Sequence, residues 1–197
     1  GGSALTMSDR KTGAIGAIAL VPALVLGTIF SILLLGGSDE ASACNPQSGS
    51  ASSISIDPDT VPDTTISGYG HEQLVNAAYI VQAGKDLDLG VRDQTIGVMT
   101  AMRESSLTVV DYGDAAGPDS RGLFQQRDNG AWGSYEDRMD PYISATNFFN
   151  AMMKVDARDS LEPTIVAHRT QGNADPYHYT KFWDSAVAVV EALSGVD

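Results

Sequence analysis

The chain has 197 residues, of which 43% are hydrophobic, and its 25 acidic and 12 basic side chains give a formal net charge of −13. The hydrophobic content is too high for a wholly disordered chain, and the acidity argues against a nucleic-acid partner, because contacts with phosphates need a basic surface. One cysteine and three scattered histidines suggest no set of metal ligands, so we predict no metal and no cofactor.

An uncharged segment of 22 residues, from Ala14 to Leu35, follows two basic residues. As a helix it would measure about 33 Å, which is enough to cross the hydrocarbon core of a bilayer. We therefore predict an N-terminal tail over residues 1–12 and a transmembrane helix over 13–36. The flanking charges place the tail in the cytoplasm and the rest outside the cell. Residues 1–6, which precede the first methionine, are left out of the fold prediction as a tag remnant or an upstream extension.

The segment Ala41-Ser42-Ala43 gives the N-terminal region two further interpretations. Small residues of this kind mark the cleavage site of a secretory signal peptide, so cleavage before Cys44 would release a secreted protein. A lipoprotein signal would instead place a lipid on Cys44 and anchor the chain by it. Two acidic residues separate the apolar run from the cysteine, which argues against lipidation, and the apolar run is longer than the roughly 7–15 residues of a signal peptide. We therefore favour the uncleaved single-pass anchor.

Residues 37–70 are rich in Ser, Thr, Asp and Pro and contain few large apolar side chains. Such a composition buries too little surface to offset the entropy lost on ordering, which predicts a flexible linker. Four aliphatic residues would let part of it dock as an edge segment: Ile54, Ile56, Val61 and Ile66.

Residues 71–197 are long enough to form one domain with its own core. Apolar side chains at helical spacing predict a first helix over 71–89. Asp93 is a suitable N-cap for a second helix. The apolar stripe of that helix contains Ile96, Met99, Thr100 and Met102.

The second half of this domain contains a turn-rich stretch and then three helix-start signals. Residues 111–133 are rich in glycine and predict a small loop or hairpin region. Asp140-Pro141 reads as an N-cap followed by proline at the first helical position. Ser160 or Glu162-Pro163 would begin the next helix, and Asp175-Pro176 the last one. We therefore predict a mainly α fold.

Glu104 lies where the second predicted helix ends. The negative end of the helix dipole and apolar neighbours would both favour the neutral acid form of this carboxyl group. A neutral carboxyl group is what general-acid catalysis at neutral pH requires. A single glutamate at a helix end is more often a solvated surface group, so the assignment needs a second motif.

The second motif is the segment from Asp119 to Arg127, in which polar side chains surround Gly122-Leu123-Phe124. Its serine and glutamines could hydrogen-bond sugar hydroxyl or amide groups. The glycine would allow close approach to the backbone, although an ordinary tight turn uses the same residues. The motif is informative only in combination with Glu104.

Together, Glu104-Ser105 and the segment Ser120 to Gln126 resemble the Glu-Ser and Gly-Leu-Met/Phe-Gln motifs of the lytic transglycosylase and goose-type lysozyme superfamily. The resemblance extends over about residues 71–194 and implies a lysozyme-like helical domain over 71–197. Further segments are similar to the lysozyme-like domain of secreted actinobacterial wall hydrolases: Asp111 to Asp114, Asn129 to Gly133, Asp140 to Phe149, and Asn173 to Tyr179.

The resemblance implies cleavage of the β-1,4 bond between N-acetylmuramic acid and N-acetylglucosamine in peptidoglycan. Glu104 would protonate the glycosidic oxygen, and Tyr177 or Tyr179 would hydrogen-bond this acid or a sugar. Ser105 would act near the acid or only cap the helix end, and Trp132 would stack on a sugar or pack as a lid. The implied substrate-binding residues are Ser105, Ser120, Gly122, Leu123, Phe124, Gln125, Gln126, Trp132, Tyr177 and Tyr179.

The reaction type depends on a second carboxylate. A hydrolase needs one, to activate water or to attack the sugar, whereas a lytic transglycosylase uses the C6 hydroxyl of muramic acid and a single glutamate. Asp111, Asp114 and Asp119 are candidates, although aspartate beside glycine or proline is also a common turn residue. We favour the transglycosylase, and the hydrolase stays the alternative.

The predicted anchor and acidic linker resemble versions encoded near conjugation genes. The expected partners are therefore peptidoglycan glycan strands, the membrane through the N-terminal helix, and a secretion or conjugation apparatus that needs local opening of the wall. Two other functions stay open: a non-catalytic peptidoglycan-binding assembly subunit, and an enzyme acting on another N-acetyl sugar polymer such as chitin.

Overall fold

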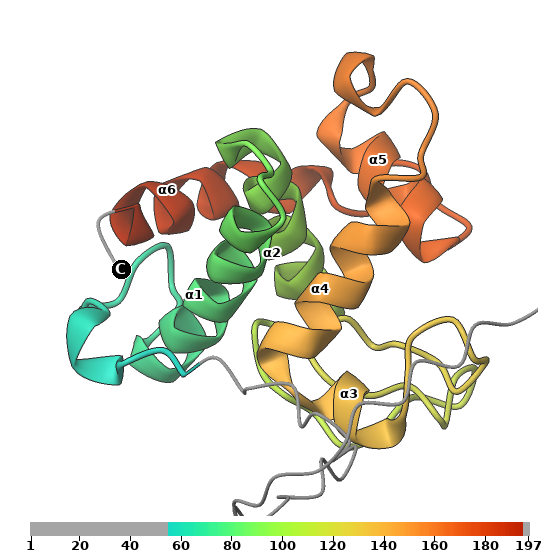
Figure 1. The fold of residues 1–197 in the computed structure, drawn as a ribbon, viewed down its shortest axis with the longest axis horizontal. Coiled ribbons are helices and arrows are strands. Elements are labelled where there is room, and N and C mark those ends of the chain that lie inside the picture. The colour runs from blue at the N-terminus through green and yellow to red at the C-terminus, as the bar shows by residue number, and fades with distance from the viewer. Residues whose placement is uncertain (1–54, 195–197) are drawn as a thin grey trace, which may run out of the picture. The chain divides into compact units, whose positions relative to one another are not determined.

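The computed structural model describes residues 55–194, and these residues form a mainly helical fold, as predicted (Figure 1). The described residues contain no strand, and their only β pairing consists of two isolated bridges, Ile66 with Tyr69 and Arg121 with Gln126. The helices in chain order are η1 (Pro58–Thr60), α1 (His71–Asp86), α2 (Val91–Ser105), α3 (Tyr135–Met139), α4 (Pro141–Met152), η2 (Arg158–Ser160), α5 (Pro163–Gln171), η3 (Thr180–Phe182) and α6 (Trp183–Leu193).

The predicted transmembrane helix over residues 13–36 and Cys44 lie outside the described residues, as does the predicted linker up to residue 54. Within residues 55–194, no helix is both long and apolar enough to cross a membrane.

The last part of the predicted linker, residues 55–70, packs against the helices. Ile56 and Val61 are buried in the core, as the docking interpretation expected. Asp57 caps η1 by accepting a hydrogen bond from the backbone N–H of Asp59. The packed unit therefore begins before residue 71, because these aliphatic side chains find apolar partners on the helical domain.

The core lies where α2 packs against α1 and α6, and where α1 packs against α4. Gly97 of α2 permits the closest approach, because a Cβ atom there would lie 2.6 Å from the ring of Phe149 on α4 and 2.9 Å from Ile80 on α1. Large side chains fill the remaining space, among them Leu74, Ile80, Ile96, Met99, Met102, Phe148, Phe149 and Val190. This core holds the end of α2 in place.

Two helix starts differ from the prediction. The N-cap of α2 is Gly90 rather than Asp93. Asp93 is instead buried in the first turn, where it forms ion pairs with Arg158 at 3.2 Å and Arg92 at 3.5 Å. Burial raises the pKa of Asp93, and the two arginines act in the opposite direction. The sequence pattern could not show this, because its arginine partner Arg158 is distant in the chain.

The last helix begins at Trp183 and not at Asp175-Pro176. The carboxylate of Asp175 accepts a hydrogen bond from the N–H of Tyr177, which forms a turn instead of a helix start. The chain then passes through η3, and this path buries Tyr179 completely.

Two other helix starts, those of α4 and α5, agree with the prediction, and the start of α3 was not predicted. Asp140 caps α4 by accepting hydrogen bonds from two backbone N–H groups of its first turn, and Pro141 is the first helical residue. Glu162-Pro163 begins α5. The short helix α3 was not predicted, although Ser134 and Asp137 form a capping box at its start.

Candidate active site

Glu104 lies in the last turn of α2, and two features fix the end of this helix. Ser106 and Leu107 adopt left-handed backbone conformations, with φ of 55° and 59°, which stop the helix just after the Glu-Ser pair. Side-chain amides from α1 then hold the turn: Gln73 donates to the carbonyl of Ser106 at 2.7 Å, and Asn76 donates to that of Leu107 at 2.9 Å. The backbone that carries Glu104 is therefore anchored to the core.

The Gly-Leu-Phe turn is attached to the same helix end. The hydroxyl of Ser105 donates to the carbonyl of Leu123 at 2.8 Å, and Gln171 of α5 donates to the carbonyl of Phe124 at 2.8 Å. The ring of Phe124 stacks on Phe148 of α4, with 4.7 Å between the centroids. The structure thus brings together the two motifs that were identified separately in the sequence.

Gly122 is required for the shape of this turn. Its φ is +73°, a conformation that residues with a side chain rarely adopt. A Cβ atom there would lie 1.9 Å from the carbonyl oxygen of Arg138, which is backbone and cannot rotate away. The glycine therefore lets the turn lie directly on the end of α3.

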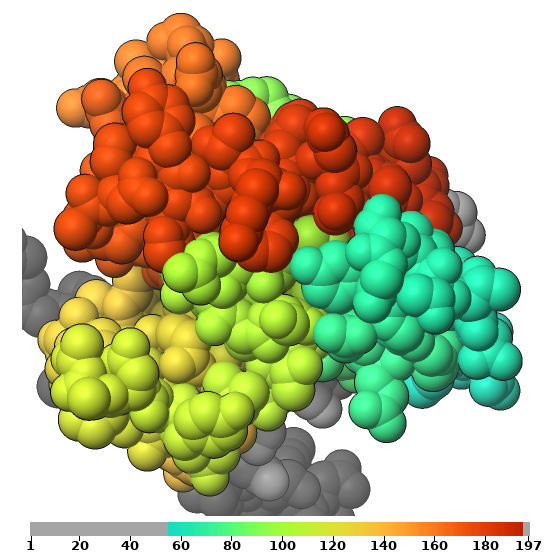
Figure 2. Space-filling view, turned by 180° about the vertical axis from the view of Figure 1, so that it is seen from behind, coloured from blue at the N-terminus to red at the C-terminus, as the bar shows by residue number. Residues whose placement is uncertain are grey.

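A polar cleft of about 460 Å³ lies beside these motifs. In Figure 2 the yellow-green loop that follows α2 borders the orange-to-red C-terminal segment, and residues from both parts line the cleft. Its lining residues are Arg103, Glu104, Tyr112, Gly113, Asp114, Ser120, Gln125 and His178. The predicted acid and three residues of the following loop, Asp114, Ser120 and Gln125, thus share one cleft.

Tyr179 is the predicted tyrosine that contacts the acid. Its hydroxyl group donates a hydrogen bond to Oε1 of Glu104 at 2.6 Å, and its side chain is fully buried. Burial, and then the negative charge of Glu104, raise the pKa of Tyr179, so this hydroxyl keeps its proton. Tyr177, the other candidate, is 61% exposed and does not line the cleft.

The three candidate second carboxylates have different surroundings. Asp114 lines the cleft with Glu104, and its Oδ1 accepts hydrogen bonds from the backbone N–H groups of Ala116 and Gly117. Asp111 forms an ion pair with Arg121 at 2.9 Å and is not among the lining residues. Asp119 is also outside the lining, so Asp114 is the candidate that the structure places near the acid.

Asp119 has a structural role in the loop. It accepts hydrogen bonds from the N–H of Asp128 at 2.8 Å and from Arg127 at 2.7 Å. The backbone hydrogen bond from Asp128 is the largest cause that lowers the pKa of Asp119.

This lowered pKa predicts a pH-dependent effect on stability. A carboxyl group whose pKa is lower when folded stabilises the fold above its unfolded pKa of about 3.9, and this effect is lost as the pH falls through the folded value. The difference in melting temperature between the wild type and Asp119→Asn should therefore be largest above about pH 5 and shrink toward about pH 2. Asp156→Asn, at an exposed site, is the control and should show no such trend. A difference for Asp119→Asn that does not vary with pH would contradict the prediction.

Several residues assigned to substrate binding are buried instead. Leu123 and Phe124 are buried, and Gln126 is buried and donates to the carbonyl of Ser144. Trp132 is only 9% exposed and is not a lining residue, which favours a packed position over a sugar platform. None of these four residues lines the cleft.

Arg103, Tyr112 and His178 line the cleft but were not among the predicted site residues. Arg103 directly precedes Glu104 in the sequence, and His178 directly precedes Tyr179. This adjacency to predicted site residues is the sequence signal that could have identified them. Asn173 was also missed, and it donates to the hydroxyl oxygen of Tyr179 at 2.6 Å. No periodicity or spacing in the sequence indicates that contact.

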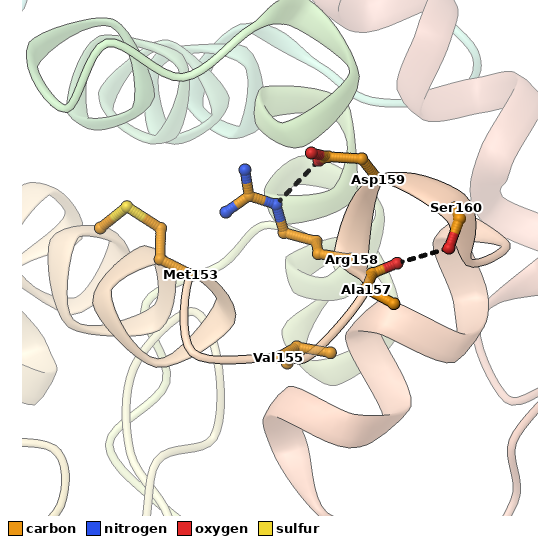
Figure 3. Close-up of a pocket in the computed structure, with 6 residues that line it drawn as sticks. All are labelled: Met153, Val155, Ala157, Arg158, Asp159 and Ser160. Carbon is orange, nitrogen blue, oxygen red and sulfur yellow. Dashed lines mark hydrogen bonds and ion pairs between the residues drawn. The ribbon is translucent and has the colours of Figure 1, made fainter.

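A second cavity of about 350 Å³ lies along the segment between α4 and α5 (Figure 3). Its one basic residue, Arg158, already pairs with Asp93 at 3.2 Å and with Asp159 at 3.3 Å. The remaining lining residues are Met153, Val155, Ala157 and Ser160, and the hydroxyl of Ser160 donates to the carbonyl of Ala157. With its charged groups paired, this cavity is a weaker candidate than the cleft at Glu104.

Among residues 55–194, no group of three or more His, Cys, Asp or Glu side chains is placed to hold a metal ion. The chain matches no protein-family model and no curated protein sequence. Functional assignment therefore depends on the geometry of the cleft and on the motifs.

Proposed function

We propose that this protein is a peptidoglycan-cleaving enzyme with a lysozyme-like domain, and that Glu104 is its catalytic acid. The observation that carries the proposal is the 2.6 Å hydrogen bond from buried Tyr179 to Glu104, a residue that lines a polar cleft together with Ser120 and Gln125. A carboxyl group that is held by a buried donor and faces a polar cleft is suited to proton transfer.

The proposed reaction uses one carboxyl group twice. Glu104 gives its proton to the glycosidic oxygen, the bond from this oxygen to C1 of muramic acid breaks, and the C6 hydroxyl of the same sugar attacks C1. The carboxylate then takes the proton of that hydroxyl group, which leaves a 1,6-anhydro end. Tyr179 donates to Oε1 and would stabilise the carboxylate between the two steps.

Two basic residues in the cleft support an anionic substrate. Arg103 and His178 line the same cleft as Glu104, and Arg103 takes part in none of the ion pairs found within residues 55–194. Of the six other arginines within residues 55–194, all but Arg169 form ion pairs with aspartates: Arg92, Arg121, Arg127, Arg138 and Arg158. An unpaired guanidinium group is available for a carboxylate of the muramyl residue or its peptide, which favours peptidoglycan over neutral chitin.

Hydrolysis is the second candidate, because Asp114 lines the cleft with Glu104. Its Oδ1 is occupied by two backbone N–H groups, as in a turn, and this favours the transglycosylase. The proposal also includes a membrane tether and local opening of the wall for a secretion or conjugation apparatus. They depend on the N-terminal segment and would confine cleavage to the wall near the membrane.

The test is to incubate the full chain, in detergent, with purified peptidoglycan and to analyse the released fragments by mass spectrometry. We expect 1,6-anhydro ends, and we expect Asp114→Asn to keep turnover within about threefold of the wild type, since a turn aspartate has no chemical role. Reducing ends together with a loss of about 10²-fold or more in Asp114→Asn would establish the hydrolase. A folded wild-type protein that releases no fragments would refute catalysis and favour a binding subunit.

A further inference from the structure

A chain of three hydrogen bonds leads from α5 to the proposed acid. Nδ1 of His168 lies 2.7 Å from Oδ1 of Asn173, and Nδ2 of Asn173 donates to the hydroxyl oxygen of Tyr179 at 2.6 Å. The hydroxyl of Tyr179 then donates to Oε1 of Glu104 at 2.6 Å. General-acid catalysis requires only Glu104, so the presence of His168, Asn173 and Tyr179 in this chain needs a separate explanation.

The direction of the chain follows from the donors that each group possesses. An amide oxygen can only accept, so Nδ1 of His168 carries the proton in its contact with Asn173. The amide nitrogen of Asn173 can only donate, and it therefore occupies the oxygen of Tyr179 as an acceptor. The single hydroxyl proton of Tyr179 is thereby left for Glu104. Every donor in the chain points toward the carboxyl group.

We infer that Asn173 is a positioning residue that directs the hydroxyl proton of Tyr179 onto Oε1 of Glu104. Since Oε1 is occupied as an acceptor, the proton that Glu104 transfers resides on Oε2. His168 supports this arrangement by fixing the orientation of the Asn173 amide. The inference rests on the proposed function for its catalytic meaning, whereas the direction of the hydrogen bonds can be measured without turnover.

The predicted consequence is a change in the pH dependence of Glu104 when the direction is reversed. A donor to a carboxylate stabilises its ionised form, so loss of this donor keeps the proton on Glu104 to higher pH. The other titratable or charged groups near Glu104 are unchanged in the variants below. They are Arg103, Tyr112, Asp114 and His178, which line the cleft.

The decisive variant is Asn173→Asp, tested in the full chain in detergent. Aspartate has nearly the same shape but can only accept, so the hydroxyl of Tyr179 would donate to it and no longer to Glu104. We expect kcat to fall about tenfold, KM to change less than about twofold, and the alkaline limb of the kcat profile to move up by about one pH unit. Tyr179→Phe, which removes the same donor, should give the same shift.

Two control variants separate the effect of the hydrogen-bond direction from that of an added negative charge and from that of losing any tyrosine hydroxyl. Ala174→Asp adds a negative charge at the next residue, which is exposed, and should leave the profile unchanged. Tyr177→Phe removes an exposed tyrosine hydroxyl outside the chain of hydrogen bonds and should also have no effect. Asn173→Leu leaves Tyr179 free to donate to Glu104 but without its supporting donor, so a smaller shift in the same direction is expected.

The ¹³C NMR signal of the Glu104 carboxyl group provides a readout that needs no substrate. The pH at which this signal changes should rise by about one unit in Asn173→Asp and in Tyr179→Phe. An unchanged signal, or an equal shift in Ala174→Asp, would overturn the inference even if the enzyme is active. If Asn173→Asp does not fold, absence of a shift in Asn173→Leu would overturn it. An inactive wild type would instead refute the proposed function, and the NMR comparison would still decide the positioning role.

Discussion

Glu104→Gln is expected to lower the rate of peptidoglycan cleavage by about 10³-fold, because an amide cannot give a proton to the glycosidic oxygen. In the wild type the hydroxyl of Tyr179 donates to Oε1 of Glu104 at 2.6 Å. The amide of the variant retains an oxygen that can accept this hydrogen bond. The cleft should therefore keep its shape, and substrate binding should change little. The measurement is the rate of fragment release under single-turnover conditions, together with pelleting of the protein with insoluble peptidoglycan.

The matched control is Glu191→Gln, which makes the same chemical change at an exposed position on α6. It should retain the wild-type rate. If both variants retain the wild-type rate, Glu104 is not the acid, and the proposed mechanism fails. If Glu104→Gln loses binding as well as turnover, the role of this residue is to hold the substrate or the cleft.

Gly122→Ala should strongly destabilise the fold. A left-handed φ costs a residue with a side chain about 1–3 kcal/mol, and the added Cβ would also clash with the carbonyl oxygen of Arg138, 1.9 Å away. Relief requires the turn and α3 to separate. We expect the free energy of unfolding to fall by about 3 kcal/mol or more, with a melting temperature lower by about 10 °C.

Gly130→Ala is a matched control for this substitution. Gly130 also has a positive φ, of +80°, but a Cβ atom there would meet nothing within 4 Å. Its cost should be limited to backbone strain, about 1 kcal/mol. The comparison therefore isolates the contact with Arg138, and equal effects of the two substitutions on the melting temperature would show that this contact has no energetic importance.

Gly122→Ala should also reduce activity in the fraction that remains folded. The turn that Gly122 begins holds Ser105 through the carbonyl of Leu123 and contributes Gln125 to the cleft. Separation of this turn from α3 would displace both. Activity measured well below the melting temperature should therefore fall in Gly122→Ala and stay near the wild-type level in Gly130→Ala.

Local sequence signals predicted the helices whose starts depend on local chemistry. Asp140-Pro141 and Glu162-Pro163 began helices as expected, because proline at the first helical position, and at α4 also the capping side chain of Asp140, act within a single turn. Asp175-Pro176 presents the same signal and failed. There the need to bury Tyr179 directs the chain through a turn and η3 before α6 begins.

The candidate acid and the tyrosine that contacts it could be named from motifs, although the choice between Tyr177 and Tyr179 could not be made. Tyr177 is 61% exposed, whereas Tyr179 is fully buried. This difference depends on how the last segment of the domain packs against α2. The same limit applies to Asp111, Asp114 and Asp119. Their hydrogen bonds and ion pairs decide which of them lines the cleft, and nothing in their spacing reveals those partners.

By itself the sequence determined a mainly helical domain, the end of a helix at Glu104, and a glycine turn later in the chain, because helix periodicity, capping and glycine geometry act over a few residues. Tertiary structure alone decided that this turn lies against that helix end, that Tyr179 reaches Glu104, and that Asn173 and His168 stand behind it. These contacts join residues as far as 75 positions apart, and they form only when burial of the shared apolar core brings the helices together.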